Sequence, residues 1–431
     1  MKKLIACLAT LILIAPPATA ANPTLTVMSR NLYLGADVGV ALELIPDMPS
    51  AAQFMWDQVK ATDFSKRSAL FLEEINRENP DVIGLQEATI WYCKPHFWSS
   101  KTEVFNFTEE LLKALDGRYV IAEHNGIQAF NPGYSIGPIP FLTTVEDPDT
   151  FQPLFGSDKA ACGFQIGDAL LVKSDRAADV LAVGNTEYEA IYKVVPTLME
   201  IRRGYTWADI RIGSTTTRFV TTHLESLFSE NDIPTAALQA QQLIDDLSKT
   251  KAPVIVMGDF NSDTRDPRGI DAPNPGGQPT ANEKCSVGAT ECNAYRLMRT
   301  AGFIDAGPDA SDPTAFTWGM SALLSAPDSN RVEAARKMGN NFGFTDRLDY
   351  IFLKNGIEVF SSRVIGTQPP YASDHAGIVS ELEITSANPD LDAPLDSHKP
   401  FPISFWQWVG LGLSALAIAI IARKVRRKRH K

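Results

Sequence analysis

Six short segments of the chain combine carboxylate, amide and imidazole side chains, which are the groups needed to hydrolyse a phosphate ester with a divalent metal ion. Three of the segments directly follow apolar or β-branched runs, Val82–Leu85, Arg218–Thr222 and Pro253–Met257, that predict strands. Polar residues gathered at strand ends indicate one rim of a sheet, where a site has rigid support and open access. In chain order the segments are Arg30-Asn31-Leu32, Leu85-Gln86-Glu87, Thr222-His223-Leu224, Gly258-Asp259-Phe260-Asn261-Ser262, Arg347-Leu348-Asp349-Tyr350 and Ser373-Asp374-His375.

A metal site can be assembled from three of these side chains. A phosphodiester is anionic, and a hard divalent cation offsets that charge so that water can attack. Such cations take carboxylate and amide oxygens as ligands. Glu87 and Asp374 can supply the carboxylates, and Asn31 can supply an amide oxygen. This oxygen-only set predicts Mg²⁺ or Mn²⁺ as the cofactor.

The remaining chemistry requires a base and hydrogen-bond donors. The attacking water must lose a proton near neutral pH, which suits a histidine, and His375 is the candidate base. Asp349 is placed to orient its ring and to stabilise the protonated form. Asn261 can stabilise charge that grows on the phosphate oxygens, and His223 can donate to a phosphate oxygen or to the leaving group. No covalent enzyme intermediate is needed.

In their order and residue types the six segments resemble the endonuclease/exonuclease/phosphatase superfamily. Its members include deoxyribonucleases, abasic-site endonucleases, inositol-polyphosphate phosphatases and bacterial sphingomyelinases. The resemblance covers roughly Leu25 to Ile384, and its most specific parts are Gly-Asp-Phe-Asn and Ser-Asp-His. It implies a four-layer α/β sandwich, in which two packed mixed β-sheets are flanked by helices and a Mg²⁺ site lies at one edge.

The resemblance also assigns roles to individual residues. It implies Asn31 and Glu87 at the metal with Asp374 beside it, and His223 and Asn261 on the phosphate. It further implies that Asp259 contacts the nucleophilic water or the metal and that Asp349 pairs with His375.

Glu225 departs from the pattern of one branch of the superfamily. Many sphingomyelinases of the family follow the Thr-His-Leu step with glutamine, where this chain has Glu225. This residue argues against a narrow sphingomyelinase interpretation and leaves the phosphoesterase interpretation intact.

Both ends of the chain predict targeting segments. Residues 1–20 have a basic start, a short apolar run and an Ala-x-Ala site, as a cleaved secretory signal does. We expect the catalytic domain over 24–385, a Pro/Asp-rich linker over 386–400, a transmembrane helix over 401–422 and a basic cytoplasmic tail over 423–431. The positive-inside rule then places the domain outside the cytoplasm, in the periplasm or at the cell surface. A sorting signal that is cut and exchanged for another anchor is the alternative for the C-terminal segment.

The charge and the cysteines fit an extracytoplasmic domain. Nine of the 40 basic residues lie in the two terminal segments, so 31 basic residues face all 51 acidic residues in between, a net charge of −20. This balance argues against tight nonspecific binding to duplex nucleic acid, which depends on Lys and Arg. Cys7 leaves with the signal peptide, and the even number that remains predicts two disulfides, a local Cys285–Cys292 pair and Cys93–Cys162.

Periodicity predicts the elements that carry the site. We expect helices over Lys66–Glu78, Pro234–Ser248 and Asn293–Ala301, and late strands over Asp346–Leu353 and Ala376–Ile384. The chain therefore predicts a membrane-anchored, monomeric, metal-dependent phosphoesterase. Its substrate stays open between a lipid head group, a nucleotide, extracellular nucleic acid and an organic phosphate. The alternatives are a nuclease, a lipid phosphodiesterase of sphingomyelinase or phospholipase C type, and a noncatalytic surface-binding protein on the same fold.

Overall fold

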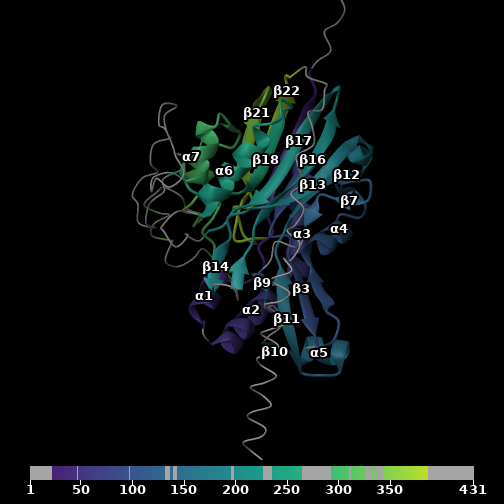
Figure 1. Ribbon diagram of the computed structural model, residues 1–431, viewed down its shortest axis with the longest axis vertical. Coiled ribbons are helices and arrows are strands. Elements are labelled where there is room, and N and C mark those ends of the chain that lie inside the picture. The colour runs from purple at the N-terminus through teal and green to yellow at the C-terminus, as the bar shows by residue number, and fades with distance from the viewer. Residues whose placement is uncertain are drawn as a thin grey trace, which may run out of the picture.

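The chain folds into a mixed α/β structure, described here from a computed structural model, in which two large β-sheets pack against each other (Figure 1). The predicted signal peptide, linker, transmembrane segment and basic tail, and the Cys285–Cys292 pair, lie outside the described residues. Within the described ranges no helix has both the length and the apolar character needed to cross a membrane. The structure describes residues 22–45, 47–96, 98–131, 136–138, 143–195, 199–226, 235–264, 293–309, 312–326, 332, 336 and 343–386.

The first large sheet is mixed. Strands β1 and β2 run parallel, and the other pairings in this sheet are antiparallel. The hydrogen-bonded order is β21 (Ile357–Ile365), β22 (Gly377–Ile384), β1 (Thr24–Asn31), β2 (Val82–Gln86), β12 (Asp168–Lys173) and β5 (Tyr119–Ile121), and β8 (Phe130–Asn131) also pairs with β12.

The second large sheet contains the other half of the predicted motifs. Strands β17 and β18 run parallel, and β18 pairs antiparallel with β20. The order is β13 (Val180–Glu187), β16 (Gly204–Ile212), β17 (Thr215–His223), β18 (Val254–Asp259), β20 (Asp349–Lys354) and β19 (Ile304–Asp305).

Smaller sheets and helices complete the described chain. A four-stranded sheet has the order β10 (Thr144–Glu146), β11 (Lys159–Gln165), β3 (Ile90–Lys94) and β4 (Thr102–Asn106), a three-stranded sheet joins β14 (Tyr192–Val195), β15 (Met199–Ile201) and β9 (Ile136–Pro138), and β6 (Glu123–His124) pairs with β7 (Ile127–Gln128). The helices are α1 (Val38–Glu43), α2 (Met48–Thr62), α3 (Phe64–Glu78), α4 (Phe107–Ala114), α5 (Pro148–Phe155), α6 (Thr235–Leu247) and α7 (Ala294–Thr300), with short 3₁₀ turns at Ser174–Asp179 and Pro313–Ala315.

Apolar side chains divide the packing into layers. One buried cluster lies between the sheets and joins Val27 and Leu170 of the first sheet to Phe219 and Ile255 of the second. Two further clusters join α3 and α4 to the outer face of the first sheet, and α6 and α7 to the outer face of the second. The order of layers is therefore helices, sheet, sheet and helices, as Figure 1 shows and as the family resemblance implies. Burial of apolar area supplies the main stabilisation of such an arrangement.

Glycine permits the closest approach of the two sheets. A Cβ atom built on Gly84 of β2 would lie 2.8 Å from the Cβ atom of Met257 in β18. Real Cβ contacts are not this short, so any larger residue at position 84 would push the sheets apart. Gly84 lies three residues before Glu87, and a displacement of the strand at Gly84 would therefore also move Glu87.

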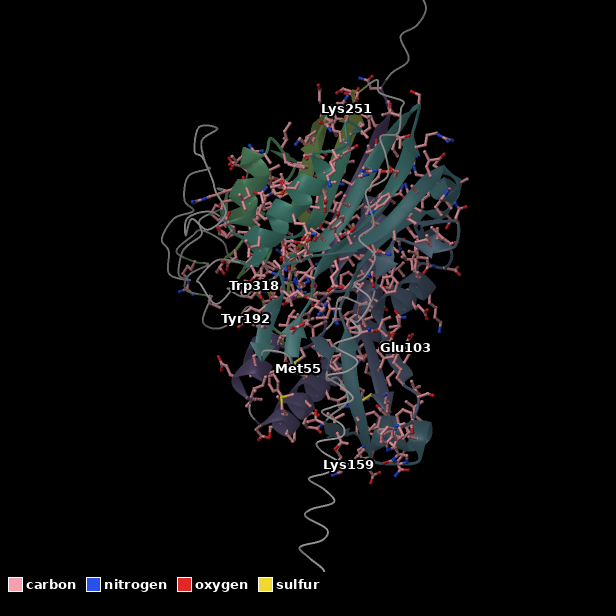
Figure 2. The ribbon with its side chains drawn as sticks, viewed as in Figure 1. Met55, Glu103, Lys159, Tyr192, Lys251 and Trp318 are labelled. Carbon is pink, nitrogen blue, oxygen red and sulfur yellow. A yellow bond between two sulfur atoms is a disulfide. The ribbon has the colours of Figure 1, made fainter. Side chains whose placement is uncertain are left out.

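Strand register brings the predicted site residues to one edge. The parallel pairing of β17 with β18 sets His223 beside Asp259, and the antiparallel pairing of β18 with β20 sets Asp259 beside Asp349. In the first sheet, Asn31 is opposite Gln86. The carboxyl ends of β1 and β17 and the start of β20 thus meet at the same edge. Figure 2 shows Trp318, which lines this region, between Lys251 at one end of the molecule and Lys159 at the other.

The predicted Cys93–Cys162 disulfide is present. The two residues are directly opposite each other in the antiparallel pair of β3 and β11, with a Cα–Cα distance of 4.1 Å and 69 residues of sequence separation. Cys93 is fully buried, and its neighbour Trp91 packs against Trp56 and Phe164. The disulfide therefore cross-links β3 and β11 of the four-stranded sheet.

Removing this disulfide is expected to lower the free energy of unfolding by about 2–4 kcal/mol, because a long loop is no longer constrained in the unfolded chain. The test is chemical denaturation of a Cys93→Ser/Cys162→Ser double variant. A Cys285→Ser/Cys292→Ser variant is the matched control and should cost less, since that pair would close a much shorter loop. Equal losses in both variants would contradict the loop-length argument.

Candidate active site

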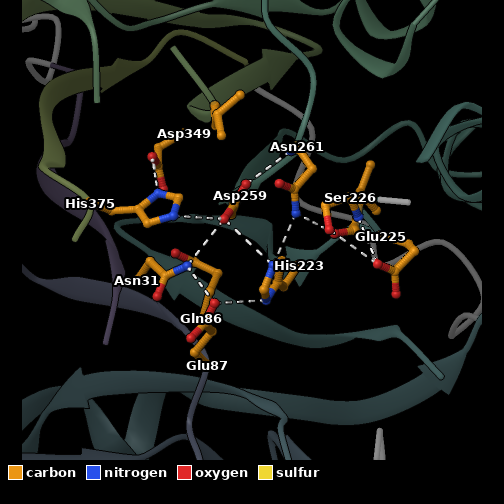
Figure 3. A network of polar contacts seen from close by, with 12 residues as sticks. Asn31, Gln86, Glu87, His223, Glu225, Ser226, Asp259, Asn261, Asp349 and His375 are labelled. Atoms are coloured by element: carbon orange, nitrogen blue, oxygen red, sulfur yellow. Dashed lines mark hydrogen bonds and ion pairs between the residues drawn. The ribbon is translucent and has the colours of Figure 1, made fainter. Parts of the chain in front are cut away.

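His375 and Asp349 form the closest ion pair at the site edge. His375 lies two residues before β22, and its Nδ1 is 2.8 Å from Oδ2 of Asp349, the first residue of β20. Both side chains are almost completely buried. The contact is the one that the sequence predicts between the base and the group that orients it. It leaves Nε2 of His375 facing the site (Figure 3).

Asp259 lies between the two predicted histidines. Its Oδ2 is 3.5 Å from Nε2 of His375 and 3.5 Å from Nε2 of His223 (Figure 3). Its Oδ1 accepts the backbone N–H of Asn261 at 2.9 Å. The carboxylate at the end of β18 is thus the centre of the cluster, with one imidazole on each side.

Glu87 and Asn31 extend the cluster into the first sheet. The Asn31 side-chain nitrogen donates to Oε1 of Glu87 at 3.3 Å and to Oδ2 of Asp259 at 3.1 Å, while its oxygen accepts the N–H of Tyr33. As a metal ligand, Asn31 would have to turn its amide oxygen towards the carboxylates, so its ligand role stays a prediction. Glu87 and Asn261 both adopt positive φ, 53° and 45° respectively. L-residues rarely adopt this conformation, and such strain is concentrated at functional sites.

The donor set fits a hard divalent cation. Asp259, Asp349 and His375 each offer one ligand atom, and these atoms lie within 4.8 Å of one another. Glu87 approaches the same cluster through Asn31, and it lies 4.0 Å from His223. Carboxylates held this close repel one another unless a cation or a proton lies between them. The predicted roles of Glu87 and Asp374 as ligands are compatible with this geometry and stay predictions.

The electrostatics of the cluster follow from burial and from its carboxylates. Burial raises the pKa of Asp259 to about 7 and that of Asp374 to about 6. Burial opposes charge on His375, but Asp349, Asp259 and Asp374 outweigh it and hold the pKa of His375 well above its usual range. For His223, burial, Arg203 and His375 all act in the same direction and hold its pKa well below the usual range. The pKa values of the two imidazoles are therefore shifted in opposite directions by their surroundings.

The metal-free protein is expected to lose stability as pH rises above about 6.5, the ordinary pKa of histidine. A histidine whose pKa is raised on folding stabilises the fold below its unfolded pKa of about 6.5, and this contribution is lost as pH rises through the higher folded value. Asp259 and Asp374 lose their contributions in the same direction, as pH rises through about 7 and about 6 respectively, and His223, whose pKa is lowered, adds no loss as pH rises. Urea unfolding in chelator at several pH values measures the slope, which His375→Asn should flatten. A free energy of unfolding that does not change over this range would contradict the prediction.

Arg203 is a functional candidate that sequence reasoning missed. It directly precedes β16, and its Nη1 lies 3.0 Å from Nδ1 of His223 while its Nε lies 3.3 Å from Oε2 of Glu225. Glu225, the residue that departs from the sphingomyelinase pattern, is therefore its ion-pair partner. The sequence signal that could have indicated Arg203 is its position next to a strand. Its contact with His223 follows only from the pairing of β16 with β17.

Two buried arginines hold the loops behind the site, and neither was predicted. Arg30 pairs with Glu74 of α3 at 2.8 Å and donates to the backbone oxygen of His375. Arg67, also on α3, donates to the backbone oxygens of Leu32 and Ala372. These bonds attach the segments next to Asn31 and Asp374 to the same helix. Removing one partner of such a buried network leaves an unpaired charge, which typically costs several kcal/mol.

A cavity of about 530 Å³ opens over the cluster. Glu87, His223, Asp259, Asn261, Asp374 and His375 line it, together with Trp318, while Asn31 and Asp349 lie completely buried behind them. The side chain of Trp318 hydrogen-bonds Asp374, and its ring centroid is 6.4 Å from that of His375. All eight residues of the predicted site are thus brought together.

Comparisons with known proteins identify the family. Solved structures similar to the chain include family proteins from Bacteroides vulgatus (16% identity, 84% of this chain, 99% of that chain, TM-score 0.43) and Beutenbergia cavernae (18%, 85%, 72%, 0.48). A truncated TDP2 from Caenorhabditis elegans is also similar (15%, 84%, 97%, 0.43). No curated protein matches the chain. Residues 51–375, well over half of the chain, match the Endonuclease/Exonuclease/phosphatase family, and the chain belongs to this family.

The family defines the class of chemistry. Its members hydrolyse phosphoester bonds with divalent metal ions, and this chain presents an acidic and histidine cluster that can hold such an ion.

Proposed function

We propose that the protein is a metal-dependent phosphoesterase in which His375, oriented by Asp349, activates the attacking water. The observation that supports this most directly is the placement of Asp259 at 3.5 Å from Nε2 of both His375 and His223, on the floor of a cavity large enough for a phosphate ester. Protein groups therefore lie on both sides of the place where the water, the phosphate and the leaving group would bind.

Each side chain has a defined task in the proposed reaction. Glu87 and Asp374, with Asn31, would hold the divalent ion, which supplies charge neutralisation for the phosphate when it is bound. Nε2 of His375 takes the proton of the water, while Asp349 accepts the hydrogen bond from Nδ1. Once the carboxylates around His375 are neutralised, less negative charge surrounds its ring, and it can be neutral at a lower pH.

Donors on the opposite side of Asp259 complete the reaction. Asn261, whose side-chain nitrogen also donates to the backbone oxygen of Leu224 at 2.7 Å, is fixed in place beside His223. Asn261 and His223 stabilise the charge that develops on the phosphate oxygens or on the leaving group.

The cavity favours a substrate with one phosphate and an uncharged remainder. Among its described lining residues, Arg203 is the one arginine or lysine, and Glu225 and His223 already engage it. A polyanion would require more cationic groups than this. The described wall is apolar over Leu34, Val38, Leu42, Ile166, Ile201 and Met320. A small phosphate ester or a lipid head group therefore fits this lining better than duplex nucleic acid.

We also propose that the domain is anchored to a membrane and lies outside the cytoplasm, and the direction of the strands bears on which way its cavity would then face. Thr24 pairs with Glu383 at the end of β1 and β22 that is opposite the site, so the chain leaves the domain far from the cavity. A linker over 386–400 and an anchor over 401–422 would then attach behind the domain, and the cavity would face away from that membrane. This arrangement favours a substrate from the surrounding medium over a lipid of the anchoring membrane.

The test is an assay of the purified protein with Mg²⁺, with Mn²⁺ and with excess chelator. The substrates are a chromogenic phosphodiester, a phosphomonoester, sphingomyelin vesicles and double-stranded DNA. We expect metal-dependent hydrolysis of the small diester to exceed that of DNA. Absence of hydrolysis on every substrate with metal present would favour the noncatalytic alternative, and a preference for DNA would favour the nuclease.

A further inference from the structure

The two site histidines meet opposite kinds of partner at the same ring atom. Nδ1 of His375 faces the carboxylate of Asp349 at 2.8 Å, whereas Nδ1 of His223 faces the guanidinium of Arg203 at 3.0 Å. Nε2 of each ring lies 3.5 Å from Oδ2 of Asp259, and Nε2 of His223 also lies 3.1 Å from the side-chain nitrogen of Asn261. The two rings thus share the carboxylate of Asp259 and differ in the side chain that contacts Nδ1.

The identity of the partner determines where the ring hydrogen of His223 lies. An arginine side chain has only donors and does not lose its proton in proteins. Nδ1 of His223 therefore accepts this hydrogen bond, which leaves the hydrogen of a neutral ring on Nε2, where Oδ2 of Asp259 can accept it. The amide nitrogen of Asn261 beside Nε2 then donates to the backbone oxygen of Leu224 at 2.7 Å and not to the ring. At His375 the logic is reversed, because the Asp349 carboxylate only accepts and requires a hydrogen on Nδ1.

Glu225 fixes Arg203 in this position. Its Oε2 is 3.3 Å from Nε of Arg203, and its Oε1 accepts the backbone N–H of Ser226 at 2.8 Å. The Glu225 side chain is 1% exposed and that of Arg203 is 11% exposed, so water screens this pair little. The backbone N–H of Glu225 donates to Gln239 of α6 at 2.8 Å, which attaches this arrangement to the helix layer.

We propose that Arg203, held by Glu225, is a positioning residue that fixes the ring hydrogen of His223 on Nε2, so that His223 donates to the substrate phosphate. This inference deepens the proposed function and rests on it for the part that concerns the phosphate. It explains why an acidic residue is suitable at position 225, since that acid neutralises the charge of Arg203 inside the site.

The chain offers a matched control at the adjacent position. Arg202 is also an arginine, but it pairs with Glu187 at 2.6 Å and with Glu200 at 3.0 Å. Its side chain is 38% exposed. Arg202→Met removes the same positive charge at the adjacent position and leaves the contact between Arg203 and His223 in place. Arg203→Met removes the donor at Nδ1, and Arg203→Lys keeps the charge and a single donor group.

Nuclear magnetic resonance of the full-length chain with ¹⁵N-labelled histidine reads the tautomer directly and does not require activity. The chain has 6 histidines, and His223→Gln assigns the resonance in question. In metal-free protein we expect the wild type and Arg202→Met to show a bare Nδ1 and a protonated Nε2 at His223. Arg203→Met should show a mixture of tautomers, and Arg203→Lys should restore part of the wild-type pattern.

Kinetics provide the second measurement. With metal and the chromogenic diester, Arg203→Met should lower kcat by about 10- to 100-fold with little change in KM, less than the roughly 10²–10³-fold that is lost when a transition-state donor is removed outright. Should Arg203→Met fail to fold, Glu225→Gln takes its place, with a mixture of tautomers expected there too.

The outcomes separate this inference from the proposed function. An unchanged His223 tautomer in Arg203→Met, or the same change in Arg202→Met, overturns the positioning role whatever the activity. A rise in KM without a change of tautomer would instead show that Arg203 binds the phosphate itself, and it also overturns the role. If the wild-type protein is inactive on every substrate and Arg203→Met still shows a mixture of His223 tautomers, the proposed function is refuted and the positioning role is supported.

Discussion

Glu87→Ala is expected to abolish turnover while the protein remains folded. Glu87 is the carboxylate of the first sheet that approaches the acidic cluster of the second, and its oxygen-donor chemistry suits Mg²⁺ or Mn²⁺. Without it the phosphate charge stays uncompensated. Excess chelator should produce the same loss of activity in the wild-type protein. Added Mg²⁺ should restore the activity lost to the chelator but not the activity lost in Glu87→Ala.

A thermal shift separates lost metal binding from lost chemistry. A ligand that binds only the folded state stabilises it by about 2.7 kcal/mol at 100 times its Kd, so Mg²⁺ should raise the Tm of the wild-type protein. Glu87→Ala should lose most of this rise, whereas Glu123→Ala, at an exposed position on β6, should keep it. Full activity in excess chelator would rule out the metal mechanism.

His375→Ala is expected to cost about 10²–10⁴-fold in kcat, which is the usual value of general-base catalysis. Asp349→Asn should cost less, because the ring remains and only its orientation and the stability of its cation suffer. The bond that the second substitution weakens is the 2.8 Å contact at Nδ1.

The pH profile distinguishes a base from a merely structural histidine. The acidic limb of the profile reports protonation of the base, so it should disappear in His375→Ala. In Asp349→Asn it should move to lower pH, since the carboxylate that raises the pKa of His375 has been removed. An unchanged acidic limb in His375→Ala would show that another group takes the proton, and Asp259, whose pKa lies at about 7, would be the candidate.

The sequence alone identified much of the fold and all eight residues of the candidate site. The reason is that these residues lie next to the ends or the starts of apolar strands, which can be recognised from local pattern, and that the family resemblance assigned their roles. The helices predicted over Lys66–Glu78 and Pro234–Ser248 are present as α3 and α6, and the predicted Cys93–Cys162 disulfide is present. The order of the motifs along the chain then indicated the family that the match over residues 51–375 shows.

Tertiary structure decided which of these residues touch and which others support them. His223 and Asp259 are neighbours because β17 and β18 run parallel in one register, and a shift by one residue would turn each side chain to the other face. Arg203 reaches His223 through the register of β16 against β17, and Trp318 comes from a separate segment after the Pro313–Ala315 turn. Such contacts depend on pairing between distant segments, and local pattern carries no information about them. Residue types next to strand ends therefore determine what chemistry is available, and sheet register determines which of these side chains touch.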